Sequence, residues 1–239
     1  MSLLQAMRER SAPFIALRHD LHMHPELGLQ EFRTAALLAE QLESWGYCVT
    51  RGLATTGLVA QLVRGNGPKR LGIRADMDAL PIQEVNSFAH RSIHDGLMHA
   101  CGHDGHTAML MAAAKYISQE LEFSGTLNLI FQPAEEYPGG AKLMIEQGLF
   151  EKFPCDAIFA AHNMPGIPAG QLVFIEGPAM ASSDDVTITL TGLGGHGAMP
   201  HLTQDPIIAA ASMVMALQTI VSRNVNPLQT AVITVGSLV

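Results

Sequence analysis

The stretch that decides the fold is Met98-His99-Ala100-Cys101-Gly102-His103-Asp104-Gly105-His106, which holds a thiol, three imidazoles and a carboxylate. Cys101 and His103 lie two residues apart and can present sulfur and nitrogen to one point. Thiolate and imidazole ligands suit zinc, cobalt, nickel or manganese rather than calcium or magnesium. The following run, Thr107–Ile117, favours a helix. The pattern predicts a metal-binding loop at a helix N-terminus; the alternative is a polar turn around a buried structural cysteine.

Two predicted strands lead directly into acidic side chains. The strand over 70–75 ends at Asp76, for which a functional role and a turn-forming role are equally plausible. The strand over 125–132 runs into Glu135 and Glu136, framed by prolines and glycines. Two adjacent carboxylates are costly to bury when both are ionised. One carboxylate bound to a metal and one acting as a base would remove that cost; a solvated acidic turn is the alternative.

A third predicted strand, 156–161, delivers His162 at its end. A lone histidine is more often a core residue than a ligand. Here strands alternate with helices predicted over 31–45 and 141–148, and three strand ends carry side chains able to bind metal. This alternation predicts an α/β fold with a site along one edge of the sheet.

The first helix, predicted over 3–21, has a start or kink near Pro13. The segment after it contains His22, His24 and Glu26, which resemble a second metal cluster. We favour the simpler interpretation that these residues cap and shape the end of the first helix.

The pattern changes after residue 182. Residues 186–191 alternate as a strand, a glycine-rich loop carries His196, Pro206 opens an apolar helix, and residues 230–235 form another strand pattern. The loop lacks the glycine spacing of a dinucleotide-binding motif. We therefore predict two domains, 1–182 and 183–239, the second an incomplete β-α-β unit.

Composition narrows the class of protein. The chain has 239 residues, 48% of them hydrophobic, and a formal net charge of −8 without a cluster of basic residues, which argues against a nucleic-acid partner. The apolar run 206–221 is expected to be too short for a bilayer. Three widely spaced cysteines favour a reducing cytoplasm. We expect a cytoplasmic protein with no membrane partner.

The candidate groups together suggest one reaction class. Cys101, His103, Glu136 and His162 offer sulfur, nitrogen and oxygen ligands for one metal ion, or for two if a group bridges. Glu135 beside them could take a proton from metal-bound water and pass it to a leaving amine. The sequence therefore predicts metal-assisted hydrolysis, most naturally of an amide.

The chain resembles the amidohydrolase branch of the zinc aminoacylase/carboxypeptidase superfamily. The resemblance is carried, in order along the chain, by the segments 18–27, 72–81, 98–106, 131–136 and 161–165. It implies hydrolysis of N-acyl amino acids, hippurate-like, with two divalent metals such as zinc, manganese, cobalt or nickel. It also implies a three-layer zinc-peptidase domain with an inserted α+β, ferredoxin-like lid through which two copies form a homodimer.

The same resemblance assigns roles to individual residues. Cys101 and His103 match the first two metal ligands, Glu136 the next ligand, His162 a further ligand, and Glu135 the general base.

Two more positions match the family pattern. His196 resembles a lid histidine that reaches the neighbouring subunit's active site and steadies the oxyanion. Asp76 matches an acidic position near the metals.

The chain departs from the family in its length. Family members are longer, and their additional part completes the lid and supplies a last histidine ligand. The alternatives to an active amidohydrolase are therefore a truncated, catalytically impaired metal-binding fragment, or a dipeptidase or carboxypeptidase of the same superfamily.

Overall fold

The structure is a computed structural model that describes residues 2–178 and 180–239. It divides into two compact units, Met1–Gly170 and Gln171–Val239. The two units are described separately. The domain boundary expected at residue 182 stays a prediction.

The first unit is built on a five-stranded sheet with the order β1-β2-β4-β3-β5. The neighbours β1 and β2, and β2 and β4, run antiparallel, whereas β3 runs parallel to both β4 and β5. The carboxyl ends of β3, β4 and β5 therefore meet at one edge of the sheet. The strands are β1 (Cys48–Leu53), β2 (Gly57–Arg64), β3 (Arg70–Asp76), β4 (Gly125–Gln132) and β5 (Ala157–Ala160).

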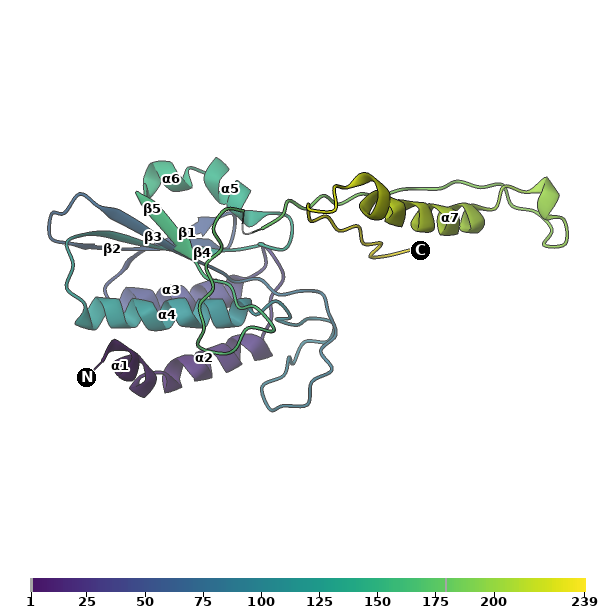
Figure 1. The fold of residues 1–239 in the computed structure, drawn as a ribbon. Helices are drawn as coiled ribbons and strands as arrows, with labels where there is room; N and C mark the ends of the chain where they lie inside the picture. The colour runs from purple at the N-terminus through teal and green to yellow at the C-terminus, as the bar shows by residue number, and fades with distance from the viewer. Residues whose placement is uncertain (1, 179) are drawn as a thin grey trace. The chain divides into compact units, whose positions relative to one another are not determined.

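Helices cover both faces of this sheet, with α2, α3 and α4 on one side and α5 and α6 on the other (Figure 1). The predicted three-layer α/β architecture is confirmed. Pro13 lies in the first turn of α2, as its fixed φ favours, and separates α2 from α1. The helices are α1 (Leu3–Glu9), α2 (Ala12–Met23), α3 (Phe32–Ser44), α4 (His103–Glu120), α5 (Gly140–Glu146) and α6 (Leu149–Lys152).

The central strands are apolar on both faces because each face is covered by helices. In β4, Leu129 and Phe131 pack into the core shared with α2, α3 and α4, whereas the intervening Ile130 packs toward α5 and α6. Leu58 and Val59 of β2 divide in the same way. This alternation fixes the register of the sheet, since a one-residue shift would exchange the two cores.

The second unit contains α7 (Pro206–Thr219), whose first turn is capped by the Asp205 carboxylate accepting from the Ile207 N–H at 2.9 Å. The 3-10 turn Pro200–Leu202 precedes α7, and the π-helical turn Ile220–Asn224 continues it. The helical run Pro206–Asn224 has 19 residues and a mean hydropathy of 1.4. By length and composition alone it is long enough to cross a membrane, so the expectation that it is too short is corrected.

The prediction of strands over 186–191 and 230–235 is wrong. Neither segment pairs as a strand within the part of the chain that the structure describes. A strand is stabilised by backbone hydrogen bonds to a neighbour, and an alternating sequence cannot supply that neighbour itself.

Tyr47 lies just after α3 and joins that region to α4, in the core shared by α2, α3 and α4. It is 4% exposed, and its hydroxyl donates to the carbonyl of Ala114 at 2.8 Å. Burial raises the pKa of the Tyr47 phenol.

We predict that this phenol makes folding stability fall at alkaline pH. An unfolded tyrosine ionises near pH 10, whereas the buried one resists ionisation, so the stabilisation is complete below pH 10 and is lost above it. Tyr47→Phe should lower the free energy of unfolding by about 1 kcal/mol at pH 8 and should flatten its decline above pH 10. Urea unfolding of both proteins across this range tests the prediction, and parallel pH curves would contradict it.

Candidate metal centre

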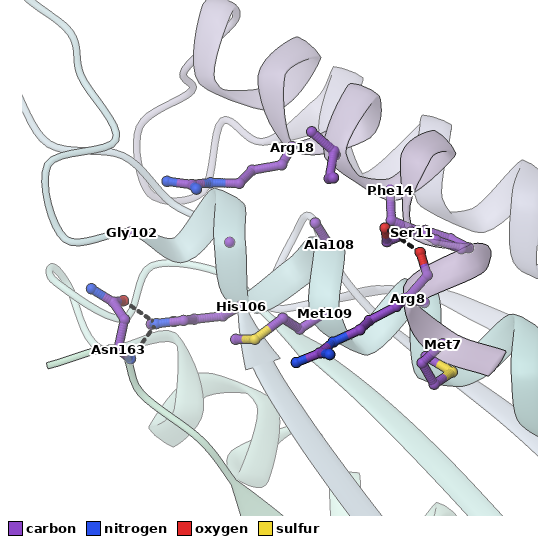
Figure 2. Close-up of a pocket in the computed structure, with 13 residues that line it drawn as sticks. Met7, Arg8, Ser11, Phe14, Arg18, Gly102, His106, Ala108, Met109 and Asn163 are labelled. Carbon is purple, nitrogen blue, oxygen red and sulfur yellow. Dashed lines mark hydrogen bonds between the residues drawn. The ribbon is translucent and has the colours of Figure 1, made fainter. Parts of the chain in front are cut away.

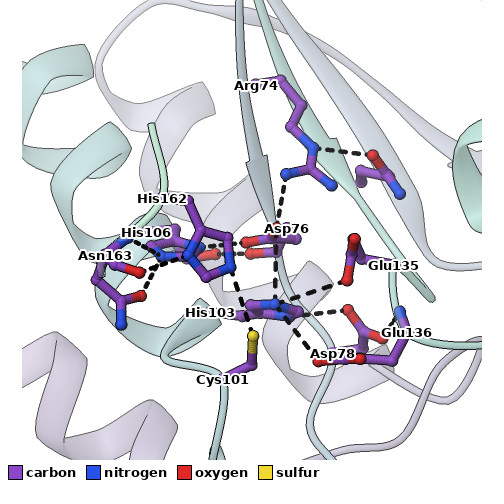
Figure 3. Close-up of polar contacts among 12 residues, drawn as sticks. Arg74, Asp76, Asp78, Cys101, His103, His106, Glu135, Glu136, His162 and Asn163 are labelled. Atoms are coloured by element: carbon purple, nitrogen blue, oxygen red, sulfur yellow. Dashed lines mark hydrogen bonds and ion pairs between the residues drawn. The ribbon is translucent and has the colours of Figure 1, made fainter. Parts of the chain in front are cut away.

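The candidate site lies where β3, β4 and β5 end and α4 begins (Figure 3). The structure brings together all five site residues that the sequence placed in this unit. Three-residue groups with ligand atoms within 4.8 Å of one another are Cys101, His103 and His162, and His103, Glu135 and Glu136.

Gly102 shapes the start of the site. It forms the N-cap of α4 with φ of +90°, in the left-handed region that favours glycine, so Cys101 stays outside the helix and His103 opens it. A Cβ at Gly102 would lie 2.6 Å from Oδ1 of Asn163. The tight turn leaves Cys101 Sγ 3.4 Å from His162 Nε2.

His103 is fully buried and presents one unpaired nitrogen to the site. Its Nδ1 lies 3.1 Å from Oδ1 of Asp78. Its Nε2 has no hydrogen-bond partner among the described residues. Carboxylate oxygens surround Nε2 at 3.7 Å (Asp76), 3.9 Å (Glu135) and 3.9 Å (Glu136).

Asp78 explains which nitrogen of His103 is free. One carboxylate oxygen faces His103 Nδ1, and the other accepts from the backbone N–H of Glu136 at 3.0 Å. A carboxylate only accepts, so His103 donates from Nδ1 and directs the Nε2 lone pair into the site. A histidine held in this way by a carboxylate is the usual arrangement of a metal ligand.

The turn that carries Glu135 and Glu136 is held from both sides. Ala134 has φ of +48°. Its N–H donates to buried Glu31 at 2.8 Å, and its carbonyl accepts from the Gly140 N–H at 2.7 Å. Gly140 has no room for a side chain, because a Cβ there would lie 1.9 Å from the carbonyl oxygen of Pro133. Glu135 and Glu136 keep 40% and 30% of their side chains exposed, so the adjacent carboxylates are not fully desolvated.

The local electrostatics favour a cation. Burial, reinforced by Glu136, Glu135 and Asp76, raises the pKa of the Cys101 thiol to about 12. Burial lowers the pKa of His103, but Asp78 and the other carboxylates outweigh it and raise the pKa overall. A bound divalent cation would invert this balance and favour the thiolate.

The residues present fit a transition-metal ion. The buried, unpaired Nε2 of His103 faces a thiol, a second imidazole and two carboxylates, which are the donor types that zinc and related metals take. A further group, Asp76, His103 and His106, has close ligand atoms. Its carboxylate is already bonded to His106 at 2.6 Å and to Arg74 at 2.6 Å, so we assign it no metal.

Sequence reasoning gave no role to three residues that hold the site, namely Asp78, His106 and Asn163. Asp78 follows Asp76 by two residues at a strand end, and His106 lies one helical turn beyond His103, so spacing offered a signal for both. Nothing in the sequence marks Asn163 except its place beside His162.

The first histidine cluster fits the simpler interpretation at two of its three residues, His24 and Glu26. His22 bonds to Asp104 at 3.0 Å and to Glu84 at 3.2 Å, and His24 bonds to a backbone carbonyl of its own helix. Glu26 accepts from backbone N–H groups in the first turn of α3. His24 and Glu26 thus have the expected contacts at helix ends, whereas His22 joins α2 to Asp104 of α4 and to Glu84.

His196 belongs to the second unit, where it is exposed and its Nδ1 accepts from the Ala198 N–H at 3.1 Å. Its role at an active site stays a prediction.

The sheet, its helices and the cluster of thiol, imidazole and carboxylate groups are those of a metallopeptidase-like α/β protein. The chain belongs to peptidase family M20/M25/M40, whose sequence profile matches residues 72–236.

Two relatives support the assignment to this family. Hippurate hydrolase of Campylobacter jejuni subsp. jejuni is 48% identical over 237 residues, 99% of this chain and 62% of the relative. N-acetyl-L-cysteine deacetylase of Bacillus subtilis is 42% identical over 225 residues, 94% of this chain and 54% of the relative. The chain thus spans little more than half of these relatives' length.

Solved structures show the same fold. A putative aminohydrolase from methicillin-resistant Staphylococcus aureus matches with a TM-score of 0.73 and 35% identity, over 98% of this chain and 60% of that one. The Bacillus subtilis YXEP protein, described as a dinuclear metal-binding peptidase of the M20 family, matches with a TM-score of 0.63 and 41% identity, over 70% and 46%.

We predict that Asp78→Asn weakens binding of zinc to the first unit. An asparagine can accept from either His103 or the Glu136 N–H but must present its NH₂ group to the other donor, so the ligand orientation is lost. Loss of such a supporting group typically weakens metal affinity about 10–100-fold. Competition with a chromogenic chelator measures the affinity. Asp95→Asn, the same change at an exposed position, is the control, and equal affinities for the two variants would refute the prediction.

Proposed function

We propose that this protein hydrolyses the amide bond of N-acyl amino acids at a site containing two divalent metal ions. Cys101, His103, Glu136 and His162 are the proposed ligands. The observation that supports this most directly is the buried, unpaired Nε2 of His103 surrounded by carboxylates. Zinc and manganese are the first metals to test, followed by cobalt and nickel.

A divalent metal at such a site acts as a Lewis acid, lowering the pKa of water and polarising the substrate carbonyl. Glu135 is the proposed general base. Its carboxylate reaches the site, with Oε2 3.9 Å from His103 Nε2, yet remains partly exposed, so water has access to it. Glu135 accepts a proton from the attacking water and then gives that proton to the leaving amine as the amide C–N bond breaks.

The names of the relatives support the proposed substrate class. Hippurate hydrolase and N-acetyl-L-cysteine deacetylase are both named for acylated amino acids. An acyl amino acid such as benzoylglycine is therefore the first substrate to test. Separately, the three widely spaced cysteines support a location in the cytoplasm.

We also propose that residues 183–239 belong to a lid through which two copies pair, and that His196 serves the partner's active site. The apolar side chains of α7 that this unit exposes, such as Ile207 and Met215, support a surface that is covered on pairing.

A second candidate is metal binding without turnover. It is favoured by the ligand cluster itself, because the thiol, imidazole and carboxylate groups that could hold an ion lie together whether or not Glu135 acts as a base.

Glu135→Gln separates the two candidates. We predict that the full chain binds metal and cleaves benzoylglycine, and that Glu135→Gln keeps the metal but loses roughly 10²–10⁴-fold in kcat. Elemental mass spectrometry and release of glycine are the measurements, and Glu151→Gln on the exposed part of α6 is the control. Metal without turnover in the wild-type chain would support the second candidate; a chain that takes up no metal would contradict both.

The role of His196 predicts complementation between inactive variants. If His196 acts across a two-fold dimer, mixing His196→Ala with Glu135→Gln leaves one complete site in each mixed dimer. Random pairing then restores about a quarter of wild-type activity. Activity assays after mixing and subunit exchange measure the recovery. Sedimentation confirms that dimers form, and persistent inactivity in mixed dimers would show that His196 does not act across the interface.

A further inference from the structure

His106 is a buried histidine that the proposed reaction does not use. It lies on α4, is 3% exposed, and faces the ends of β3 and β5 rather than the core (Figure 3). Both of its ring nitrogens are bonded, one to Asp76 and the other to Asn163.

The Asp76 contact fixes one side of the ring. Asp76 Oδ1 lies 2.6 Å from His106 Nδ1, while Oδ2 accepts from Arg74 at 2.6 Å. Arg74 also donates to Gln132 of β4 at 2.8 Å, so the carboxylate is anchored to two neighbouring strands. His106 is therefore tied to the rigid sheet.

The Asn163 contact fixes the other side. The backbone N–H of Asn163, which can only donate, lies 3.0 Å from His106 Nε2. Asp76 only accepts, so Nδ1 carries the proton, and in the neutral ring Nε2 has the lone pair that accepts from the Asn163 N–H. The side-chain Oδ1 of Asn163 is also placed against Nε2 (Figure 2); because two acceptors cannot share a hydrogen bond, this arrangement requires the Asn163 amide to be turned so that its NH₂ group faces the ring. The same side chain packs against Gly102.

Asn163 in turn orients His162. The carbonyl oxygen of Asn163 accepts from His162 Nδ1 at 2.6 Å, which leaves Nε2 directed at Cys101 Sγ. A backbone carbonyl holding one nitrogen of a ligand histidine fixes its tautomer and its ring orientation. The position of the Asn163 backbone therefore decides where the His162 ring points.

Little else holds this segment. Past Ala160, the last residue paired with β3, residues 161–163 are bonded to the rest of the described unit through His106 and through the Cys101–His162 contact. His106 and Asn163 also border a cavity of about 490 Å³ lined by α1, α2 and α4 (Figure 2), so packing does not support the segment on that side.

We propose that His106 is a positioning residue that holds the segment 161–163 against the start of α4 and so places the His162 ring. The part that concerns metal binding rests on the proposed function, in which His162 is a ligand. The part that concerns the segment itself does not.

Two conservative variants separate the two contacts of His106. Asparagine places its amide where Nδ1 lies and keeps only the Asp76 contact, whereas glutamine reaches the place of Nε2 and can accept from the Asn163 N–H. A role limited to core stability predicts no advantage for glutamine in ordering residues 161–163. His94→Asn and His94→Gln, at an exposed position, are the matched controls.

The first measurement is cobalt binding to the full chain. We expect His106→Asn to weaken cobalt affinity about 10–100-fold, with a change in the visible absorption that reports loss of an imidazole ligand. We expect His106→Gln to retain most of the affinity. Equal losses in both variants, or no loss in either, would overturn the proposal that His106 places a ligand.

The second measurement needs no metal. Hydrogen exchange by NMR should show a protected Asn163 amide in the wild type and in His106→Gln, and an unprotected one in His106→Asn. In the unsubstituted chain, a scalar coupling between the Asn163 amide nitrogen and His106 Nε2 should cross the hydrogen bond, and its absence would overturn the proposal even if the variants failed to fold. A wild type that binds no cobalt but shows this coupling would defeat the proposed function and leave the positioning role of His106 in place.

Discussion

The first unit depends on the buried pairing of His103 with Asp78. Asp78 accepts from the imidazole and from the Glu136 N–H at once, so a single carboxylate ties the start of α4 to the turn after β4. The same bond directs the free Nε2 of His103 toward the acidic side chains. A buried carboxylate with two such donors is stable, whereas the unpaired nitrogen that it creates is costly unless an ion occupies the site.

The parallel arrangement of β3 with β4 and β5 makes this pairing possible. Three strands that run the same way end at one edge, and each ends in side chains that bind protons or metals. Two glycines permit the backbone geometry around the site. Gly102 allows the left-handed turn before α4, and Gly140 allows the backbone to pass beside the carbonyl of Pro133. The site is therefore a product of sheet direction and of two positions where a side chain does not fit.

Supporting residues make the candidate site rigid without entering it. Glu31 holds the turn before Glu135 by accepting from the Ala134 N–H, and it is itself bonded to the Thr56 hydroxyl at 2.5 Å. Burial of the Glu31 carboxyl raises its pKa, while the hydrogen bonds from Thr56 and Ala134 act in the opposite direction. Groups of this kind need an environment that several elements build together, and they keep ligand atoms in place before any ion arrives.

The sequence by itself determined the strands and helices that carry the candidate site and the identity of the candidate ligands. The spacing of Cys101 and His103 identified them as candidate ligands. Glu135, Glu136 and His162 were identified by their places after apolar strands. Both signals are properties of the local sequence. Only the tertiary structure decided that Asp78 orients His103 and that His106 joins Asp76 to Asn163, because those contacts depend on strand order, which local sequence does not encode. The same reason explains the second unit. The alternation in 186–191 and 230–235 predicts strands, but neither segment pairs in the described chain, because a strand needs backbone hydrogen bonds to a neighbouring strand.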